Sequence, residues 1–234
     1  MWSGQHISFH NIVFDASGSS LGKTVSLTHP ANNIRFYDCG FKGFKKSEGS
    51  VVGTLAPDCC FIRCKFYDSG EHGIYVATNT QHGDRASHRL VLFDCEFWNN
   101  KKWGIHINNE DWPLDPKGIV IAHNYSHGNY GGLVSSGGVG TRIYRNTITN
   151  NERGVWLGYK GSEGTRLERN AIIFNRREGL MFDECVKNAQ IRKNVIAFNG
   201  KADVFNRTGT NFGTGTVWDD NFVRDGSNKG TTNE

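Results

Sequence analysis

Apolar and polar positions along the chain follow a short phrase that recurs nine times. Each copy consists of an apolar residue, two mainly polar residues, a marker that is usually Cys or Asn, any residue, and a second apolar residue. The markers are Ile12, Cys39, Cys64, Cys95, Asn124, Asn146, Asn170, Asn194 and Asn221. The intervals between them are 27, 25, 31, 29, 22, 24, 24 and 27 residues, with a mean of about 26. Such a period predicts a repeat fold in which each copy contacts only its neighbours.

A second phrase follows eight or nine residues after five of these markers and predicts a strand. It is a glycine followed by alternating apolar positions, and it begins at Gly73, Gly104, Gly132, Gly154 and Gly179. Alternation with period two is typical of a strand with one buried face, and the glycine marks a sharp turn before it. Leucine is too scarce for a leucine-rich repeat, and the period is too short for a propeller blade. The pattern therefore predicts a solenoid of short strands.

One coil carries the repeat in full, with Asn146, Ile148, Asn151 and Gly154 at the spacing Asn-x-Ile-x-x-Asn-x-x-Gly. This coil resembles the PbH1-type repeat of pectate-lyase-like proteins, and the resemblance extends over residues 6–223. It implies an all-β fold, a single-stranded right-handed parallel β-helix of about nine coils over residues 1–223, with residues 224–234 as a polar C-terminal tail. Lyases, hydrolases, esterases, epimerases and inert fibre proteins share this scaffold, so the resemblance implies a fold and not one activity.

The markers are expected to stack above one another inside the solenoid. The three cysteine markers would form an inward column that continues into the five asparagine markers, whose amides can bond along the axis. Side chains in register point the same way, which disfavours disulfides, so we expect free thiols in the core. Cys59 is expected to point inward as well, whereas the environments of Cys60 and Cys185 are left open.

Composition and charge narrow the class of partner. The hydrophobic fraction is 37%, the mean hydropathy is -0.52, and no apolar run approaches the ~20 residues that span a bilayer, so no membrane partner is expected. The net charge of +4 and the isoelectric point near 8.7 favour an acidic partner. Because Lys and Arg are scattered, nucleic acid is not expected. The chain shows no signal peptide, but the resemblance implies an extracellular or cell-surface location.

Neither end of the predicted solenoid is followed by an amphipathic capping helix. The first coil starts within a few residues of Met1, and only the polar tail follows Val223. An uncapped parallel edge can pair with another chain. We therefore expect that the chain is a section of a longer protein, that other elements shield its ends, or that the ends support self-association.

The chemistry is expected on the outward side of the glycine-initiated strands. Because side chains alternate along a strand, one outward stripe comprises Tyr75, His106, Val134, Trp156 and Met181. Two insertions, residues 78–88 and 108–117, are expected to project beside it, as insertions in solenoids often form the binding face. Residues 103–108 align with the Tyr-Gly-x-Asp-Pro-His pattern of mannuronan epimerases. His106 stands in place of the Asp and Asn108 in place of the His, which argues against an epimerase.

The stripe and the resemblance together favour an enzyme, a polysaccharide lyase that cleaves an anionic polysaccharide by β-elimination. This reaction needs a base for the C5 proton, an acid for the leaving oxygen and a group that neutralises the carboxylate. We expect His106 to be the base and Tyr75 the acid, with Asn108 and a nearby cation as neutralising groups. The candidate substrate-binding residues, cations and an aromatic platform, are Trp156, Arg153, Lys102, Arg85 and Tyr159.

Other interpretations stay open at this point. Asp183 and Glu184 could ligate Ca²⁺, a hard cation that prefers carboxylates and that some of these lyases use, although acidic pairs in turns are more often only solvated. His106, Tyr75 and Trp156 could equally be ordinary surface residues. The functional alternatives are a non-catalytic glycan-binding or structural shaft module, tailspike-like or on a cell surface, and a glycoside hydrolase or uronan epimerase.

Overall fold

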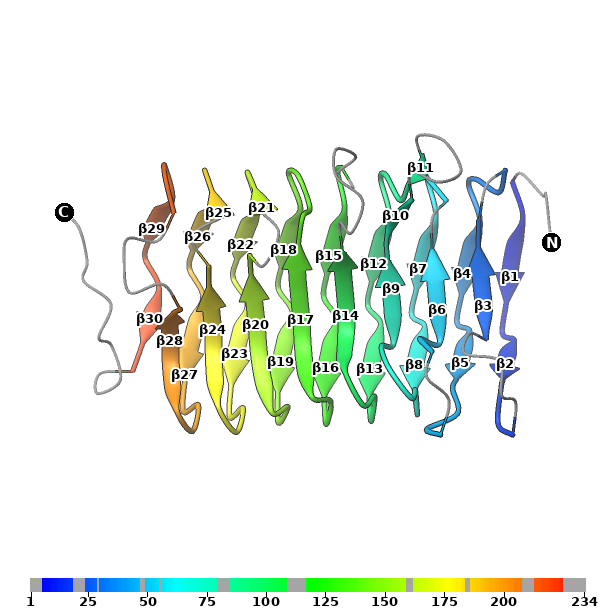
Figure 1. Cartoon of the computed structure of the whole chain (residues 1–234), viewed down its shortest axis with the longest axis horizontal. Coiled ribbons are helices and arrows are strands. Elements are labelled where there is room, and N and C mark those ends of the chain that lie inside the picture. Colours follow the sequence, from blue (N-terminus) through cyan, green and yellow to red (C-terminus); the bar gives the residue numbers. More distant parts are fainter. Residues whose placement is uncertain are drawn as a thin grey trace.

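The computed structural model describes residues 6–18, 24–28, 30–46, 49–54, 56–79, 85–108, 117–158, 162–183, 186–207 and 213–224. The regular elements of these residues are all β-strands, and the chain winds as a right-handed parallel β-solenoid (Figure 1). This confirms the predicted fold class. The described residues contain no helix with the length and apolar character that crossing a membrane requires. The boundary at residue 223 stays a prediction, and residues 225–234 of the predicted tail lie outside the described residues.

Three long sheets form the walls of the solenoid, and their strands pair in parallel with the equivalent strands of the next coil. Sheet 1 contains nine described strands: β1 (Ser8–His10), β4 (Arg35–Tyr37), β7 (Cys60–Ile62), β12 (Val91–Phe93), β15 (Val120–Ala122), β18 (Arg142–Tyr144), β22 (Arg166–Glu168), β26 (Gln190–Arg192) and β29 (Val217–Asp219). Sheet 2 also contains nine: β2 (Val13–Asp15), β5 (Gly40–Lys42), β8 (Lys65–Tyr67), β13 (Glu96–Trp98), β16 (Tyr125–His127), β19 (Thr147–Thr149), β23 (Ala171–Ile173), β27 (Val195–Ala197) and β30 (Phe222–Val223).

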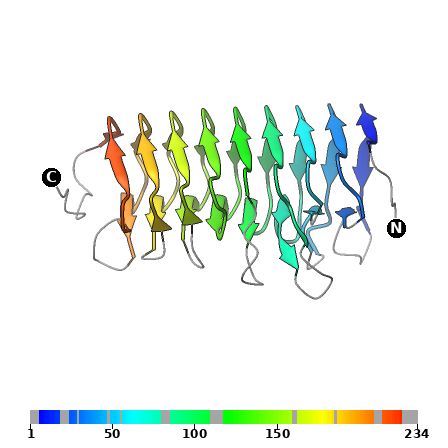
Figure 2. The ribbon, with the colours of Figure 1, turned by 90° about the horizontal axis from the view of Figure 1, so that it is seen from above.

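Sheet 3 contains the five glycine-initiated strands together with three others, and faces one side of the molecule. Its eight described strands are β3 (Val25–Leu27), β6 (Val52–Thr54), β9 (Ile74–Val76), β14 (Trp103–Asn108), β17 (Gly131–Ser136), β20 (Arg153–Leu157), β24 (Glu178–Phe182) and β28 (Ala202–Asn206). The glycine-initiated strands are β9, β14, β17, β20 and β24. Two small sheets, β10 (Thr78–Asn79) with β11 (Arg85–Ala86) and β21 (Ser162–Glu163) with β25 (Val186–Lys187), lie outside these walls. Figure 2 shows the first and last coils at opposite ends of the rod.

Two columns of phenylalanine rings fill the interior of the first coils. One column is Phe9, Phe36 and Phe61, and the other is Phe14, Phe41, Phe66 and Phe97. Axial neighbours within a column stack with ring centroids 4.6–5.2 Å apart and ring planes within 13° of parallel. These separations match the spacing of paired strands, so one ring fits each coil. From the next coils on, aliphatic residues such as Leu92 and Ile121 take the positions of the first column.

The marker column runs through the turn between sheets 1 and 2, as predicted. Asn146 Oδ1 accepts hydrogen bonds from both the backbone N–H and the Nδ2 of Asn124, each at 2.9 Å, and the same pair of bonds continues coil by coil to Asn221. On the cysteine side, the backbone N–H of Cys95 donates to Asn124 Oδ1 at 2.9 Å. The five cysteines among the described residues are free thiols. Cys185 lies outside the described residues.

A second asparagine ladder occupies the turn between sheets 2 and 3. Its members, which are all buried, are Asn100, Asn129, Asn151, Asn175 and Asn199. Each Oδ1 from Asn129 onward accepts the backbone N–H and the Nδ2 of the preceding member at 2.9–3.2 Å. Asn199 donates in the same way to Asp203 Oδ1, at 2.8 and 3.0 Å. Each of these asparagines lies in the same turn of its coil. The hydrogen bonds between them therefore hold the turn from which each strand of sheet 3 begins.

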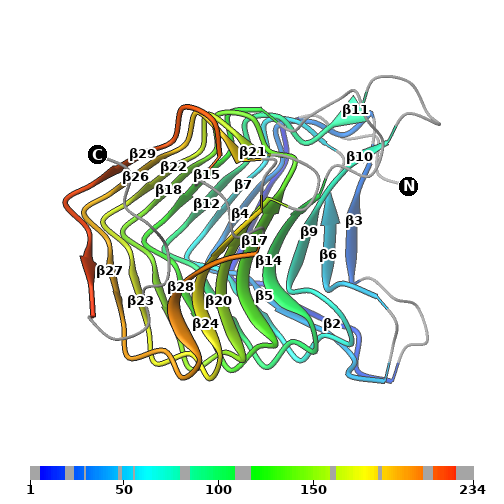
Figure 3. The same cartoon turned by 60° about the vertical axis from the view of Figure 1, so that its left-hand side comes forward.

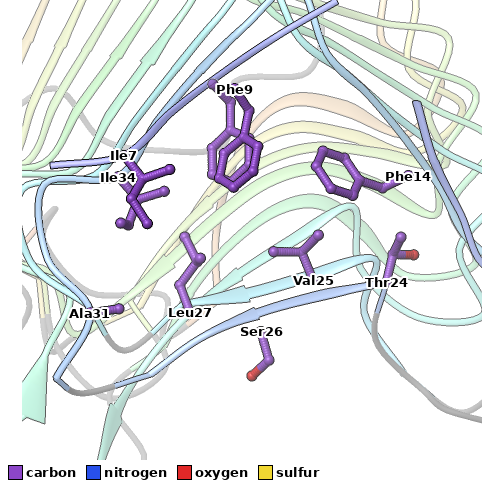
Figure 4. A pocket seen from close by; sticks show the side chains of 10 residues that line it. Ile7, Phe9, Phe14, Thr24, Val25, Ser26, Leu27, Ala31 and Ile34 are labelled. Atoms are coloured by element: carbon purple, nitrogen blue, oxygen red, sulfur yellow. The ribbon is translucent and has the colours of Figure 1, made fainter. Parts of the chain in front are cut away.

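A cavity of about 380 Å³ marks the N-terminal end of the core. It lies between β1, β2 and β3, and its lining is mainly apolar (Figure 4). Phe9, Val25 and Leu27 face into it, whereas Ser26 points away. The cavity is an extension of the core interior and belongs to the first coil, so it is separate from the outward stripe that begins on β9. Self-association through the ends of the solenoid stays a prediction.

Candidate functional site

The outward stripe on sheet 3 has the predicted register. Tyr75 pairs with His106, His106 with Val134, Val134 with Trp156, and Trp156 with Met181. The alternating neighbours Ile74, Ile105 and Ile107 are buried in the core. Figure 3 shows β14, β17, β20, β24 and β28 side by side along this wall. Residues 22 to 31 positions apart in the sequence are therefore neighbours along one axis.

A second outward position lies just before the glycine of each strand, and the repeat pattern did not single it out. It holds His72 before β9, Trp103 in β14, Gly131 in β17, Arg153 in β20 and Glu178 in β24. The alternation of the strand is interrupted here by the turn. A Cβ on Gly131 would overlap the indole of Trp103, so this glycine is the reason that the indole lies flat on the outer face. Side chains at this position lie beside the stripe and widen it.

A polar cluster brings together His72, Tyr75, His106, Asn108 and Ser136. The ring centroids of Tyr75 and His106 are 5.0 Å apart and their planes are nearly perpendicular. Asn108 Nδ2 donates a hydrogen bond to the hydroxyl oxygen of Tyr75. Ser136 Oγ contacts Asn108 Oδ1 at 3.2 Å. Asn108 and Ser136 are buried, so the amide is held in one orientation with its donor group toward the phenol.

The two histidines of this cluster are linked to each other and to the backbone. The backbone N–H of Trp103 donates to His72 Nδ1 at 3.2 Å, and His72 Nε2 lies 3.1 Å from His106 Nδ1. Burial lowers the pKa of His72 to about 2, and repulsion from the Lys102 ammonium, and from His106 when that imidazole is protonated, adds to the effect. Burial, together with the Lys102 ammonium, lowers the pKa of His106 to about 4. Both imidazoles are therefore neutral at pH 7.

An apolar cluster continues the stripe on the next coils. Trp103, Val134 and Met181 are buried although they lie on the outer face, because they pack against one another and against Trp156. Their contact explains why two residues expected to face solvent, Val134 and Met181, do not. Together they place an aromatic surface two coils from His106.

Trp156 itself is held from two sides. Its Nε1–H donates to Asp183 Oδ2 at 2.9 Å, and the guanidinium of Arg207 lies 4.7 Å from the ring centre. Arg207 also forms an ion pair with Asp183 Oδ1 at 3.5 Å. Both carboxylate oxygens of Asp183 thus have partners, and a cation adjoins them.

This arrangement does not fit Ca²⁺ at Asp183, because the adjoining guanidinium would repel the metal. No group of three or more His, Cys, Asp or Glu side chains suited to a metal occurs among the described residues. Glu184, the second predicted ligand, and Tyr159, the predicted extension of the platform, lie outside the described residues. Arg85 is the first residue of β11, and its side chain also lies outside the description.

A charged cluster borders the stripe on β20, β24 and β28. The Glu178 carboxylate is buried and contacts Arg153 at 3.2 Å, Arg177 at 3.5 Å and Lys201 at 3.0 Å. Burial favours the neutral acid, but the hydrogen bond from Lys201 and the charges of Arg177 and Lys201 outweigh it. The pKa of Glu178 therefore lies below its ordinary value of 4.5. Arg153 also donates to the hydroxyl of Tyr130.

The structure thus gathers most of the described candidate residues on one face. Tyr75, His106 and Asn108 are in mutual contact or linked by one partner, Lys102 lies at the edge in an ion pair with Glu71, and Trp156 and Arg153 follow two coils further on. No role was assigned from the sequence to His72 or Glu178, and the strand register placed Ser136 on the outward face without a role. For His72 a signal was present, because it precedes Gly73 as Trp103 precedes Gly104.

Comparisons with known proteins identify similar chains. The family model described as "right handed beta helix region" matches residues 51–217. No curated protein sequence matches the chain. Among solved structures, the catalytic unit of an α-1,3-glucanase from Streptomyces thermodiastaticus covers 94% of this chain and is covered over 45% of its own length, with a TM-score of 0.73 and 13% identity.

Two other solved structures, an epimerase module and a tailspike protein, have the same fold. The A-module of a mannuronan C-5 epimerase from Azotobacter vinelandii covers 88% of this chain, with 62% of its own length matched, a TM-score of 0.52 and 14% identity. The Dettilon tailspike protein covers 80%, with 43% of its own length matched, a TM-score of 0.59 and 12% identity. The chain spans less than two thirds of each of these structures. At these identities the likeness shows a shared fold.

Proposed function

Because the chain belongs to the right-handed β-helix family, we propose that it acts on a polysaccharide bound along the outer face of sheet 3. One observation carries this proposal: one outward stripe brings the polar residues Tyr75 and His106 into line with Trp156, two coils beyond His106. Coils are spaced by about 4.8 Å, which is comparable to one sugar unit of an extended chain. The likeness to a glucanase and to a mannuronan epimerase supports a carbohydrate substrate. An extracellular or cell-surface location would suit such a substrate.

The charges on this face favour an acidic polysaccharide. The ion pairs along it join five cations, Lys102, Arg153, Arg177, Lys201 and Arg207, to three carboxylates, Glu71, Glu178 and Asp183. The adjoining pair of Glu152 and Arg176 adds one charge of each sign. The net excess of two positive charges lies on the part of sheet 3 that also carries the aromatic cluster. A carboxylate-bearing sugar would be attracted to this face.

The reaction that this geometry supports best is β-elimination of a uronate. The Tyr75 oxygen faces the Asn108 amide donor, which stabilises negative charge on it. As phenolate, Tyr75 takes the proton from C5, the electron pair forms the C4–C5 double bond, and the C4–O bond breaks. Tyr75 then returns the proton to the leaving oxygen, which restores the phenolate.

His106 takes a different part from the base expected from sequence. Its Nδ1 is occupied by His72 and its pKa lies at about 4, so at neutral pH it can donate through Nε2 but is a poor proton acceptor. A neutral imidazole donor can stabilise the developing charge on the substrate carboxylate, with the Lys102 ammonium beside it. Asn108 acts on Tyr75 in this scheme and not on the carboxylate.

The test is absorbance of the unsaturated uronate product after incubation with pectate, alginate and glycosaminoglycans, each with and without Ca²⁺. Turnover is expected on at least one polymer and should be lost in Tyr75→Phe. Tyr125→Phe is the matched control, because Tyr125 is an exposed tyrosine on sheet 2. New reducing ends without unsaturated product would instead indicate a hydrolase, and inverted uronate without cleavage would indicate an epimerase.

A non-catalytic glycan-binding module is the second candidate. The observation that favours it is the buried apolar cluster of Trp103, Val134 and Met181 with the partly exposed Trp156 packed against it, which supplies a rigid aromatic surface without any acid–base group. The likeness to a tailspike protein is consistent with it. This alternative predicts binding of a polymer by calorimetry that survives the double substitution Tyr75→Phe/His106→Ala, with no product formed by the parent chain.

A further inference from the structure

His72 occupies an unusual place for a histidine on the surface of a solenoid. It lies in the turn before β9, at the outward position that Trp103 takes on the next coil, and it is buried. Its ring centroid is 4.4 Å from that of His106 and 5.6 Å from that of Tyr75. One imidazole thus adjoins both Tyr75, the proposed base and acid, and His106, the proposed donor to the substrate carboxylate.

The hydrogen bonds of His72 have only one consistent direction. A backbone N–H can only donate, so the bond from Trp103 requires His72 Nδ1 to be the unprotonated acceptor. Neutral His72 must then carry its proton on Nε2, which donates to His106 Nδ1. His106 Nδ1 is therefore an acceptor as well, and the proton of neutral His106 lies on Nε2. This series of hydrogen bonds begins at the backbone N–H of Trp103 and fixes the tautomer of His106.

The same series of hydrogen bonds opposes protonation of His106. A proton on His106 Nδ1 would face the Nε2–H of His72, so two donors would point at each other. The groups that surround His106 do not compensate, since Val134 on β17 is apolar, the Tyr75 ring packs edge-on, and the Lys102 ammonium carries the same charge. Glu71, a carboxylate at this edge, is engaged with Lys102.

From this geometry we propose that His72 is a positioning residue that holds His106 as a neutral imidazole with its proton on Nε2, ready to donate to the substrate. The proposal rests on the proposed function for its role in turnover, but the tautomer is a property of the free protein. His72 itself is not a catalytic residue, because it acts through His106. If His72 only filled space, replacing its ring nitrogens with carbon would not affect His106.

The experiment is a pH titration of ¹⁵N-labelled imidazoles by long-range NMR, which distinguishes the two tautomers by the chemical shifts of the ring nitrogens. In the wild-type protein His106 should show a protonated Nε2 and an unprotonated Nδ1, and should stay neutral at pH 5. His127, on the outer face of sheet 2, is the internal control within the same spectra. A protonated Nδ1 on neutral His106, or titration near 6.5, would overturn the proposal without reference to any activity.

Two variants separate positioning from space filling. His72→Phe keeps an aromatic ring and removes both nitrogens, so His106 should become a mixture of tautomers, while burial and the Lys102 ammonium still hold its pKa below the ordinary value. His72→Gln keeps a donor at the Nε2 position and should retain the wild-type tautomer. If the chain is a lyase, kcat should fall about 10-fold to 100-fold in the first variant and recover in the second.

The outcomes also distinguish failure of this inference from failure of the proposed function. If His72→Phe does not fold, the wild-type spectra still decide the tautomer. Absence of lyase activity with the expected tautomer would contradict the proposed reaction and leave the hydrogen-bond chain standing. Lyase activity with equal kcat in wild type and a folded His72→Phe would refute the positioning role.

Discussion

Asn151 offers the sharpest test of how the turns beside the site are held. It is fully buried in the middle of the second ladder. Its Oδ1 accepts the backbone N–H and Nδ2 of Asn129, both at 3.0 Å. Its Nδ2 donates to the carbonyl oxygens of Ser126 at 3.0 Å and Thr149 at 3.1 Å. Asn151→Ala removes all of these hydrogen bonds at once.

The magnitude follows from the groups that are left behind. The buried N–H of Asn129 loses its acceptor, which costs about 1–3 kcal/mol. Each of the two lost bonds to a carbonyl adds about 0.5–1.5 kcal/mol. We expect a loss of about 3 kcal/mol in the free energy of unfolding, which corresponds to a fall of about 6–12 °C in Tm for a chain of this size.

The assay is urea and thermal unfolding followed by circular dichroism. Asn150→Gly is the matched control, because Asn150 is exposed and has a φ of 54°, which glycine adopts without strain. The control should change the free energy of unfolding by no more than about 0.5 kcal/mol. A loss below about 1 kcal/mol in Asn151→Ala would refute the argument that the ladder supports the turn.

Three further predictions concern the neighbouring coils. Gly154→Ala should destabilise the protein or prevent folding, because its Cβ would overlap the backbone oxygen of Gly179; thermal unfolding measures this. Glu178 has a lowered pKa, so its contribution to stability is present above about pH 4.5 and is lost as the pH falls through the lower, folded-state value; Glu178→Gln should abolish that part of the dependence of Tm on pH. Trp156→Ala should weaken glycan binding about 10-fold by calorimetry, because it removes the indole two coils from His106 on which a sugar ring would stack.

Each of these predictions has a control in the chain. Gly140→Ala meets no atom within 4 Å and should cost only the strain of its φ of 63°. Glu163→Gln removes an exposed carboxylate and should leave the pH dependence of Tm unchanged. Trp98→Ala removes an indole on sheet 2 and should not alter glycan affinity. Equal effects in a variant and its control would contradict the corresponding argument.

The fold could be predicted from the sequence because each coil repeats the same requirement. The markers Cys64, Cys95 and Asn124 stand at one point of the coil, so stacking follows from the period alone. The second ladder has an equally regular signal, because Asn100, Asn129 and the later members each follow a marker by five residues. This spacing was recognised only in the coil that contains Asn151. The end of the ladder at Asp203, where a carboxylate takes the place of the next amide, has no counterpart in the repeat.

The site was predictable only as far as register determines it. Alternation placed Tyr75, His106 and Trp156 on one face, and the structure agrees. Alternation does not describe the turn before each glycine, so His72 and its bond to His106 were missed. A stripe of outward residues also does not reveal which of its members bury one another. Val134, for example, is buried because it packs against Trp103 and Trp156. Contacts between coils, and not positions within one coil, determine the chemistry.

The most direct test of the proposed function is a crystal structure of Tyr75→Phe soaked with uronate oligosaccharides, since this variant should bind the oligosaccharide without cleaving it. We expect sugar density along the axis of sheet 3, with a carboxylate within hydrogen-bond distance of His106 Nε2 and a sugar ring against Trp156. Density confined to another face, such as the aromatic surface around Trp98 on sheet 2, would contradict the proposed function.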